Sequence, residues 1–145
     1  MDKIFIDGTG CILGRLASNV AKLSKMGKEV IVLNCEKIVL KGEKNMIINE
    51  YRDIYKRIGG RHKGPFWQRK ADAFVRRAIR GMLEYKKTKG AKAYNHVKVY
   101  IGIPKEYTSV PKDNFMDFPE AKLKSGTSKF IYVKDLTKEL GGRWL

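Results

Sequence analysis

The sequence contains very little cysteine. Its two cysteines, Cys11 and Cys35, form no CxxC pair and have no neighbouring cluster of histidines. A structural zinc site needs four ligands, which this pattern does not supply. Both cysteines follow predicted strands and could be neighbours, but two reduced thiols in a cytoplasmic protein are the favoured interpretation. We therefore expect no bound metal.

Long hydrophobic runs are also missing. Every apolar run is far shorter than the roughly 20 residues needed to cross a bilayer. The first three residues, Met1 to Lys3, do not lead into the apolar segment of an export signal. These absences predict a cytoplasmic protein with no membrane partner.

The motifs of several enzyme classes are absent as well. The sequence has no GxSxG, no phosphate-binding loop of the form G-x-x-x-x-G-K-[ST], and no Asp/Glu/His set with two-metal spacing. A binding protein is favoured over an enzyme. We expect no catalytic residue, no cofactor and no small-molecule substrate.

Acidic residues are scarce relative to basic ones. The chain has 31 Lys and Arg against 15 Asp and Glu, a net charge of +16 on 145 residues. Such an excess destabilises the compact state by self-repulsion unless a polyanion neutralises it. Residues 52–92 hold 14 basic and three acidic side chains, a net charge of +11. Within it, the helix and loops of residues 57–92 are therefore the predicted contact with a polyanion.

The rest of the chain alternates short apolar runs with helical patterns. Strands are predicted at 4–7, 30–33, 96–102 and 129–134. Helices are predicted from Leu13 up to Gly27, over 43–58, over 71–83, and from Asp135 as N-cap up to Gly141. In a chain about one domain long, this alternation predicts a single parallel α/β domain over 1–145.

Glycines between the first strand and the first helix resemble a dinucleotide-binding turn. That turn needs G-x-G-x-x-G, but after Gly8 and Gly10 the sixth position is Leu13 and the glycine follows at Gly14. Glu36 could serve as the ribose-binding carboxylate. The other interpretation is a tight turn with close helix packing, which is favoured because no second half-site follows. A nucleotide- or dinucleotide-binding enzyme using the Gly8–Gly14 turn is the alternative function.

Arg15 is placed in the first turn of the first predicted helix. The helix dipole disfavours a cation there. An external phosphate at this position would explain the placement.

Three arginines share the polar side of the predicted helix at 71–83. Arg76, Arg77 and Arg80 lie opposite an apolar side with residues three and four apart. Arg76 and Arg80 are like charges four residues apart, which costs a few tenths of a kcal/mol. Guanidinium groups offer paired donors that match phosphate oxygens. We therefore expect this side to contact a phosphate backbone.

The segments on either side of this helix are also basic. The loop GGRHKGPFWQRK (59–70) mixes cations with two aromatic rings, which suits single-stranded or looped RNA. We expect one of Phe66 and Trp67 to stack on RNA and the other to anchor the loop; the sequence does not say which. His62 is expected to contact RNA rather than to catalyse. In KKTKGAKAYNH (86–96), we expect the long, flexible lysine side chains to contact phosphate groups of the RNA.

Several blocks of the sequence resemble one known family. RRAIRGMLEYKKTKGAKAYNHVKVYIGIP (76–104), GCILGRLAS (10–18) and VIVLNCEKIVLKG (30–42) resemble segments of the ribosomal protein L13 family of the large subunit. The loop at 59–70 resembles its archaeal and eukaryotic branch. Two positions differ, since Glu84 and Ala71 stand where the family commonly has proline, and both bear on helix ends.

The resemblance implies a fold, a role and a set of partners. The implied fold is a three-layer α/β/α domain with a four-stranded parallel sheet and basic loops. The implied role is a non-catalytic constituent of the large ribosomal subunit that binds its rRNA early in assembly, beside neighbouring ribosomal proteins and not as a homo-oligomer. The residues predicted to bind RNA, on charge and resemblance together, are Arg15, Arg57, Arg61, His62, Lys63, Trp67, Arg69, Lys70, Arg76, Arg77, Arg80, Lys86, Lys87, Lys89 and Lys92.

Overall fold

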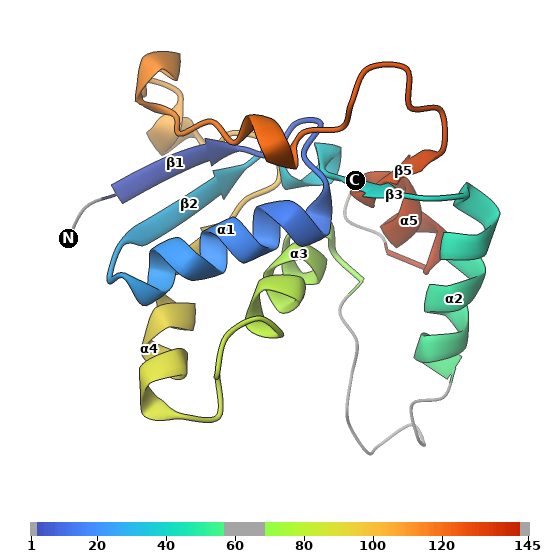
Figure 1. Ribbon diagram of the computed structural model, residues 1–145, viewed down its shortest axis with the longest axis horizontal. Helices are drawn as coiled ribbons and strands as arrows, with labels where there is room; N and C mark the ends of the chain where they lie inside the picture. The colour runs from blue at the N-terminus through green and yellow to red at the C-terminus, as the bar shows by residue number, and fades with distance from the viewer. Residues whose placement is uncertain (1–2, 57–68, 143–145) are drawn as a thin grey trace.

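A computed structural model of the chain describes residues 3–56 and 69–142 (Figure 1). Predictions made for residues between these ranges therefore lie outside the described part. They concern Arg57, Arg61, His62, Lys63, Phe66 and Trp67.

The main sheet has three parallel strands in the order β1-β2-β4. They are β1 (Lys3–Asp7), β2 (Glu29–Leu33) and β4 (Val97–Val99). β2 lies in the centre and is buried from Val30 to Leu33, as expected for a strand covered on both faces. At the edge, β1 alternates between buried and more exposed residues. An uninterrupted run of buried apolar residues therefore distinguishes the central strand from the edge strand.

Three helices cover one face of this sheet (Figure 1). They are α1 (Leu13–Lys25), α3 (Ala71–Arg80) and α4 (Thr88–Asn95). Their buried side chains form one core with Ile4, Val30 and Val97 of the strands. α1 follows the predicted bounds, whereas α3 ends three residues before the predicted end at 83. Met82, in the turn that follows, is 41% exposed.

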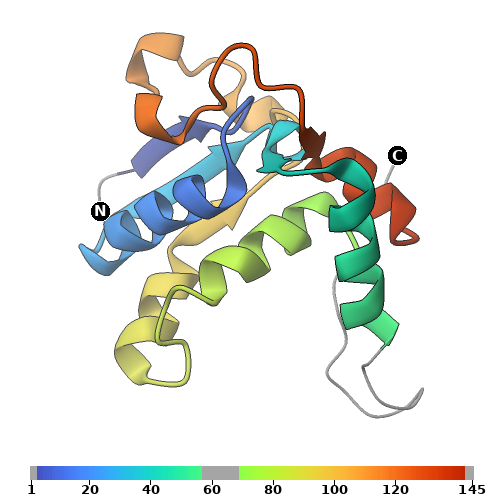
Figure 2. The same cartoon turned by 45° about the vertical axis from the view of Figure 1, so that its right-hand side comes forward.

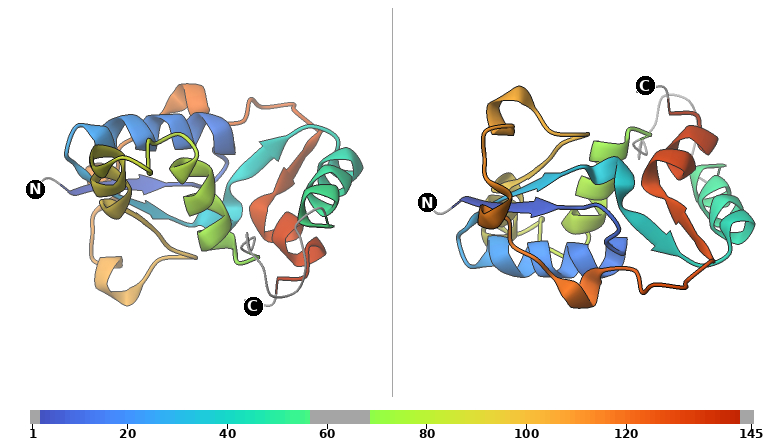
Figure 3. Two further views of the ribbon diagram at one scale, coloured as in Figure 1. Left: turned by 90° about the horizontal axis from the view of Figure 1, so that it is seen from below. Right: turned by 90° about the horizontal axis from the view of Figure 1, so that it is seen from above.

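The opposite face of the sheet is covered by turns. Phe5 of β1 packs edge-on against Tyr107 and stacks with Phe115, at centroid distances of 5.3 and 6.1 Å. These rings belong to the passage after β4, which contains the short 3₁₀ turns η2 (Lys105–Tyr107) and η3 (Lys112–Asn114). Figure 3 shows this passage on the side of the sheet away from α1. The second outer layer of the expected α/β/α arrangement is therefore built here from turns.

A second, smaller sheet completes the fold. β3 (Val39–Lys41) follows the 3₁₀ turn η1 (Cys35–Lys37) and pairs antiparallel with β5 (Phe130–Tyr132). The helices α2 (Lys44–Lys56) and α5 (Val133–Glu139) lie side by side next to this sheet (Figure 2). An ion pair at 3.0 Å between Arg52 and Glu139 joins them. One continuous core includes residues of both sheets and of all five helices described.

The expected sheet of four parallel strands is not what the described residues form. The segment predicted as the fourth strand, at 129–134, contains β5, which pairs with β3 instead of joining β4. The physical reason is that the passage after β4 covers the opposite face of the main sheet with Tyr107 and then reaches the edge of β1, where Phe115 forms an isolated parallel bridge with Phe5. The chain then returns beside η1, where the Val133 N–H donates to the Ile38 carbonyl at 2.8 Å. The main sheet thus has three parallel strands.

Several helix ends also differ from expectation. α5 begins at Val133 with Tyr132 as N-cap, so Asp135 lies in the first turn and is not the cap. Ala71 is the first residue of α3, a position that accepts proline because its N–H has no partner within the helix. Glu84 lies in the turn between α3 and α4. Both departures from the family pattern thus stand at or beyond helix ends.

Within the described residues, none of the helices has the length and apolar character needed to traverse a bilayer.

Candidate nucleic-acid interface

The glycine turn between β1 and α1 is closed by packing. The Gly8 N–H donates to the Leu33 carbonyl at 2.9 Å, and a Cβ atom on Gly8 would lie 2.8 Å from the Ile38 side chain. Gly10 has a φ of +74°, a conformation that residues with a side chain rarely adopt. Close packing and backbone conformation therefore account for these two glycines.

The carboxylate that the alternative function requires is used within the fold. Glu36, in η1, accepts a hydrogen bond at 2.9 Å from the backbone N–H of Gly102. This bond joins the segment after β2 to the segment after β4. A carboxylate held in this way is poorly available to a ribose, and the geometry thus disfavours a dinucleotide-binding enzyme.

Arg15 lies at the surface in the first turn of α1. Its Nη1 donates to the Glu120 carbonyl at 3.2 Å, and the Ile12 N–H donates to the Ala121 carbonyl at 2.7 Å. The turn η4 (Pro119–Ala121) is thereby held against the start of the helix. Arg15 is still exposed, and a guanidinium has five N–H donors, so it can also reach an anion in solution.

The two cysteines are buried inside the protein. Burial raises the pKa of the Cys11 thiol to about 11 and raises the pKa of Cys35 further. Both are free thiols, protonated at neutral pH and poorly suited to bind a metal or act as nucleophiles. Across residues 3–56 and 69–142, no three His, Cys, Asp or Glu side chains gather closely enough to hold a metal ion.

α3 carries the three arginines that its sequence pattern predicted to lie on one side. Ala71, Val75 and Ile79 are fully buried against the core. Arg76, Arg77 and Arg80 are half-buried. The structure thus confirms the two-sided character of this helix but gives the arginines different surroundings.

Arg76 turns toward α4 and holds its end. Its Nε donates to the Val97 carbonyl at 3.2 Å, and its Nη2 donates to the Tyr94 carbonyl at 3.4 Å. Its guanidinium carbon also lies 4.1 Å from the centroid of the Tyr94 ring. A cation at the C-terminal end of a helix satisfies carbonyl groups that have no partner within the helix. Arg76 therefore has a structural role that its sequence position did not reveal.

Arg77 and Arg80 form a ridge between two hollows in the surface. On one side is a cavity of about 330 Å³, here called the aromatic groove, lined by Tyr51, Tyr55, Phe74 and Tyr85 as well as by the two arginines. On the other side is a cavity of about 300 Å³, the polar groove, where Asp72, Arg76 and Tyr94 join the same two arginines. Both hollows thus share Arg77 and Arg80.

Arg69 and Lys70 come directly before α3, and both are exposed. The guanidinium of Arg69 lies 5.7 Å from the centroid of the Tyr55 ring on α2. A Cβ atom on Gly142 would collide with the Arg69 carbonyl, so the end of α5 packs closely on this backbone. Arg69 therefore lies beside Tyr55 in a neighbouring hollow, which Arg52, Glu139 and Leu140 also line.

Four lysines extend the basic surface beyond α3. Lys86 and Lys87 lie in the turn before α4, Lys89 and Lys92 lie on α4, and all four side chains are exposed. Lys87 approaches Glu84 at 3.8 Å, an exposed pair of little energetic weight. The segment 86–96, for which no helix was predicted, is thus in part a helix. Asp72 and Glu84 are the only acidic residues between 69 and 92.

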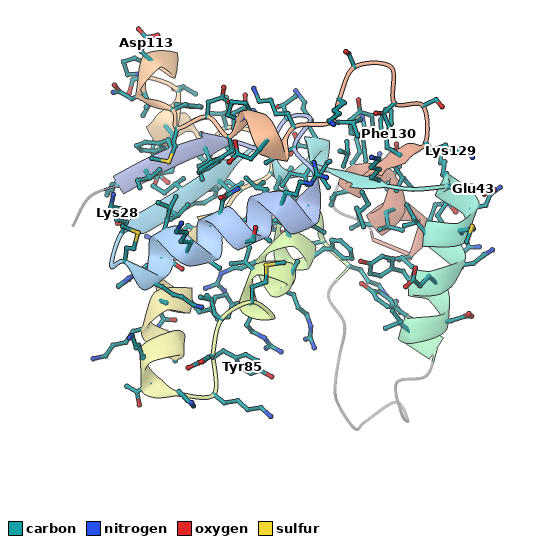
Figure 4. The ribbon with its side chains drawn as sticks, viewed as in Figure 1. Lys28, Glu43, Tyr85, Asp113, Lys129 and Phe130 are labelled. Carbon is teal, nitrogen blue, oxygen red and sulfur yellow. The ribbon has the colours of Figure 1, made fainter. Side chains whose placement is uncertain are left out.

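Sequence reasoning missed the tyrosines that contact the arginines. Tyr94 lies under Arg76, and Arg80 lies 4.3 Å from the centroid of the Tyr85 ring in the turn after α3 (Figure 4). The spacing of Tyr51 and Tyr55 on α2 was a usable signal. It placed both rings on the apolar side of a predicted helix, but it could not show that this side faces α3.

Comparisons with known proteins identify close relatives. The family model described as "Ribosomal protein L13" matches residues 2–106. The chain is 43% identical to the "Large ribosomal subunit protein uL13" of Methanosphaera stadtmanae, covering 96% of this chain and 97% of the relative. It is 40% identical to the protein of the same name from Methanocaldococcus jannaschii, covering 96% and 98%, and 38% identical to that of Saccharolobus solfataricus, covering 95% and 92%.

Proposed function

The chain belongs to the ribosomal protein L13 family, and we propose that it contacts the rRNA of the large ribosomal subunit directly through α3 and the basic segments beside it. The chain is a structural constituent of this cytoplasmic subunit and not an enzyme. Its partners are the rRNA and neighbouring ribosomal proteins. We further propose that it acts as a single copy without a small-molecule substrate.

The observation that supports this contact is the concentration of cations around α3. Arg77 and Arg80 line the aromatic groove, Arg69 lies beside its Tyr55 ring, and the four lysines from 86 to 92 continue the basic surface. Few acidic side chains accompany them. A surface of this kind would be repelled by its own charge in isolation and is stabilised when phosphates lie against it.

Each group of cations has a distinct task in the proposal. The arginines of α3 bind phosphates by paired donors in a fixed direction, because their helix is packed on the core. The lysines contact phosphates along the RNA backbone as point charges on flexible side chains. Arg15 extends the contact to the start of α1. We propose that Arg57, Arg61, His62, Lys63 and Trp67 also contact the RNA.

The proposed role in early assembly follows from the same charges. Phosphate groups of folding rRNA repel one another, and neutralising them releases bound counterions. A rigid α/β domain that presents cations on one side therefore favours the close approach of RNA segments. The fold supplies the rigidity, and α3 supplies the charge.

The double substitution Arg77→Glu with Arg80→Glu tests this function. We expect it to abolish incorporation into large subunits, measured by sucrose-gradient sedimentation of tagged protein. Lys41→Glu with Lys44→Glu makes the same charge change on exposed residues outside 52–92, and this control is expected to incorporate. Normal incorporation of the arginine double variant would contradict the proposed interface.

A further inference from the structure

The aromatic groove has the chemistry of a site for a flat, uncharged ring. Tyr51 and Tyr55 lie one turn apart on α2 and face Phe74 of α3. The rings of Tyr51 and Phe74 pack at a tilt of 58°, with centroids 5.3 Å apart, so they form a preformed wall. Tyr85, in the turn after α3 (Figure 4), also lines the groove and is 38% exposed. A cavity of about 330 Å³ lies near the lower end of the range for small-ligand sites, about 300 Å³.

Two of the tyrosine rings already have a guanidinium beside them. Arg80 lies 4.3 Å from the Tyr85 centroid, and Arg69 lies 5.7 Å from the Tyr55 centroid. Stacking on an aromatic ring or on a guanidinium plane is the usual way in which proteins hold an unpaired base of RNA. Both kinds of surface meet in this groove.

The hydroxyl groups of Tyr51 and Tyr55 stay protonated at neutral pH. Burial raises the pKa of Tyr51, and it raises that of Tyr55 to about 12 although Arg69 and Arg77 act in the opposite direction. A protonated hydroxyl is a hydrogen-bond donor, so Tyr51 can donate to an acceptor atom at the edge of a base.

The arginines on the ridge of α3 can bind a phosphate beside the groove. Arg77 and Arg80 line both the aromatic and the polar groove, and Arg76 adds a third cation on the polar side. A nucleotide has a flat ring at one end and an anion at the other. The pairing of an aromatic hollow with an arginine ridge matches that division, whereas an apolar peptide segment would supply no anion.

We propose that the aromatic groove receives one unpaired base of the bound RNA while the arginines of the ridge hold the phosphates beside it. This inference rests on the proposed function, because the RNA is first attracted by the basic surface. It adds that the protein recognises a splayed-out nucleotide as well as backbone charge. Helical RNA, whose bases are stacked within the duplex, would not fill the groove.

The experiment compares two ligands that differ only in their bases. The full-length protein is titrated at one fixed salt concentration with a single-stranded RNA of mixed sequence and with an abasic strand of the same length and charge. Tyr55→Leu and Tyr85→Leu remove a ring from the groove. Tyr132→Leu is the matched control, because Tyr132 also has a cation near its ring, Lys134 at 5.6 Å, but lies outside the groove on β5.

The wild-type protein is expected to bind the base-bearing strand more tightly than the abasic strand. Each groove variant is expected to lose roughly 5- to 100-fold of its affinity for the base-bearing strand and none for the abasic strand. Tyr132→Leu should leave both affinities unchanged. Tyr85 is partly exposed, so its variant is expected to fold even if Tyr55→Leu does not.

Two results would overturn the inference in different ways. If the groove variants bind both strands as the wild type does, or lose affinity for both equally, no base occupies the groove, while RNA binding by the basic surface stands. If the wild-type protein binds neither strand, nor folded large-subunit rRNA, the proposed function fails together with the inference.

Discussion

At the scale of single residues, two helical glycines have opposite surroundings. Gly90 is buried in α4, and a Cβ atom there would collide with the carbonyl of Glu84 in the turn before the helix. Gly14 is exposed in α1, and a Cβ atom there would have no neighbour within 4 Å. Alanine is favoured over glycine in a helix by about 1 kcal/mol. The same substitution should therefore have opposite effects at the two sites.

We predict that Gly90→Ala lowers the free energy of unfolding by about 1–3 kcal/mol, because the backbone of the turn must move away from the added methyl group. Gly14→Ala should raise it by up to about 1 kcal/mol. Urea denaturation of the free protein measures both values, and Tm should shift by about 2–4 °C for each kcal/mol. A Gly90→Ala protein as stable as the wild type would refute the close packing of the turn on α4.

At the scale of elements, the helices with strong local patterns could be predicted and the others could not. α1 follows from apolar residues three and four apart that end before Gly27. α4 was missed because its sequence, TKGAKAYN, is short, rich in lysine and interrupted by Gly90. Its end is instead stabilised by Arg76 of α3. A contact between distant segments cannot be read from local periodicity.

The candidate site was predictable to a similar extent. Charge counting found α3 and the lysines beside it, because those signals are local. It did not show that Arg76 bonds to the carbonyls at the end of α4 or that Tyr51 of α2 packs on Phe74 of α3. The pairing of β3 with β5 was missed for the same reason, since antiparallel partners so far apart in sequence depend on the path of the whole chain.

The contacts of Arg76 lead to a prediction about α4. Arg76→Met keeps much of the side-chain volume but leaves the carbonyls of Tyr94 and Val97 without the guanidinium. We expect a loss of about 1–3 kcal/mol of stability and faster hydrogen exchange, concentrated in α4. Native-state hydrogen exchange followed residue by residue measures this effect.

Arg80→Met is the matched control for this prediction. Arg80 is on the same helix, but its ring contact is with Tyr85, which is partly exposed in the turn after α3. The control should leave exchange in α4 close to that of the wild type. Equal exchange in α4 for both variants would show that Arg76 does not hold this helix.

At the scale of the whole molecule, the net charge of +16 acts on folding and on binding in opposite directions. In the free protein the cations repel one another, and salt screens this repulsion. In the complex with RNA the same cations replace counterions on phosphates, and added salt opposes that exchange. One property of the chain therefore predicts two salt dependences of opposite sign.

We predict that raising NaCl from ~0.05 M to ~0.5 M increases the Tm of the free protein, because the screening length falls from about 14 Å to about 4 Å. Over the same range, log K for large-subunit rRNA should fall linearly with log [NaCl], by about 0.7–0.9 for each phosphate contacted. Arg77→Glu with Arg80→Glu should make both dependences shallower, because it removes charge from both processes. Calorimetry and filter binding provide the two measurements. If the double variant kept the full slope for RNA while its Tm lost its salt dependence, α3 would contribute to repulsion in the free protein but not to the interface.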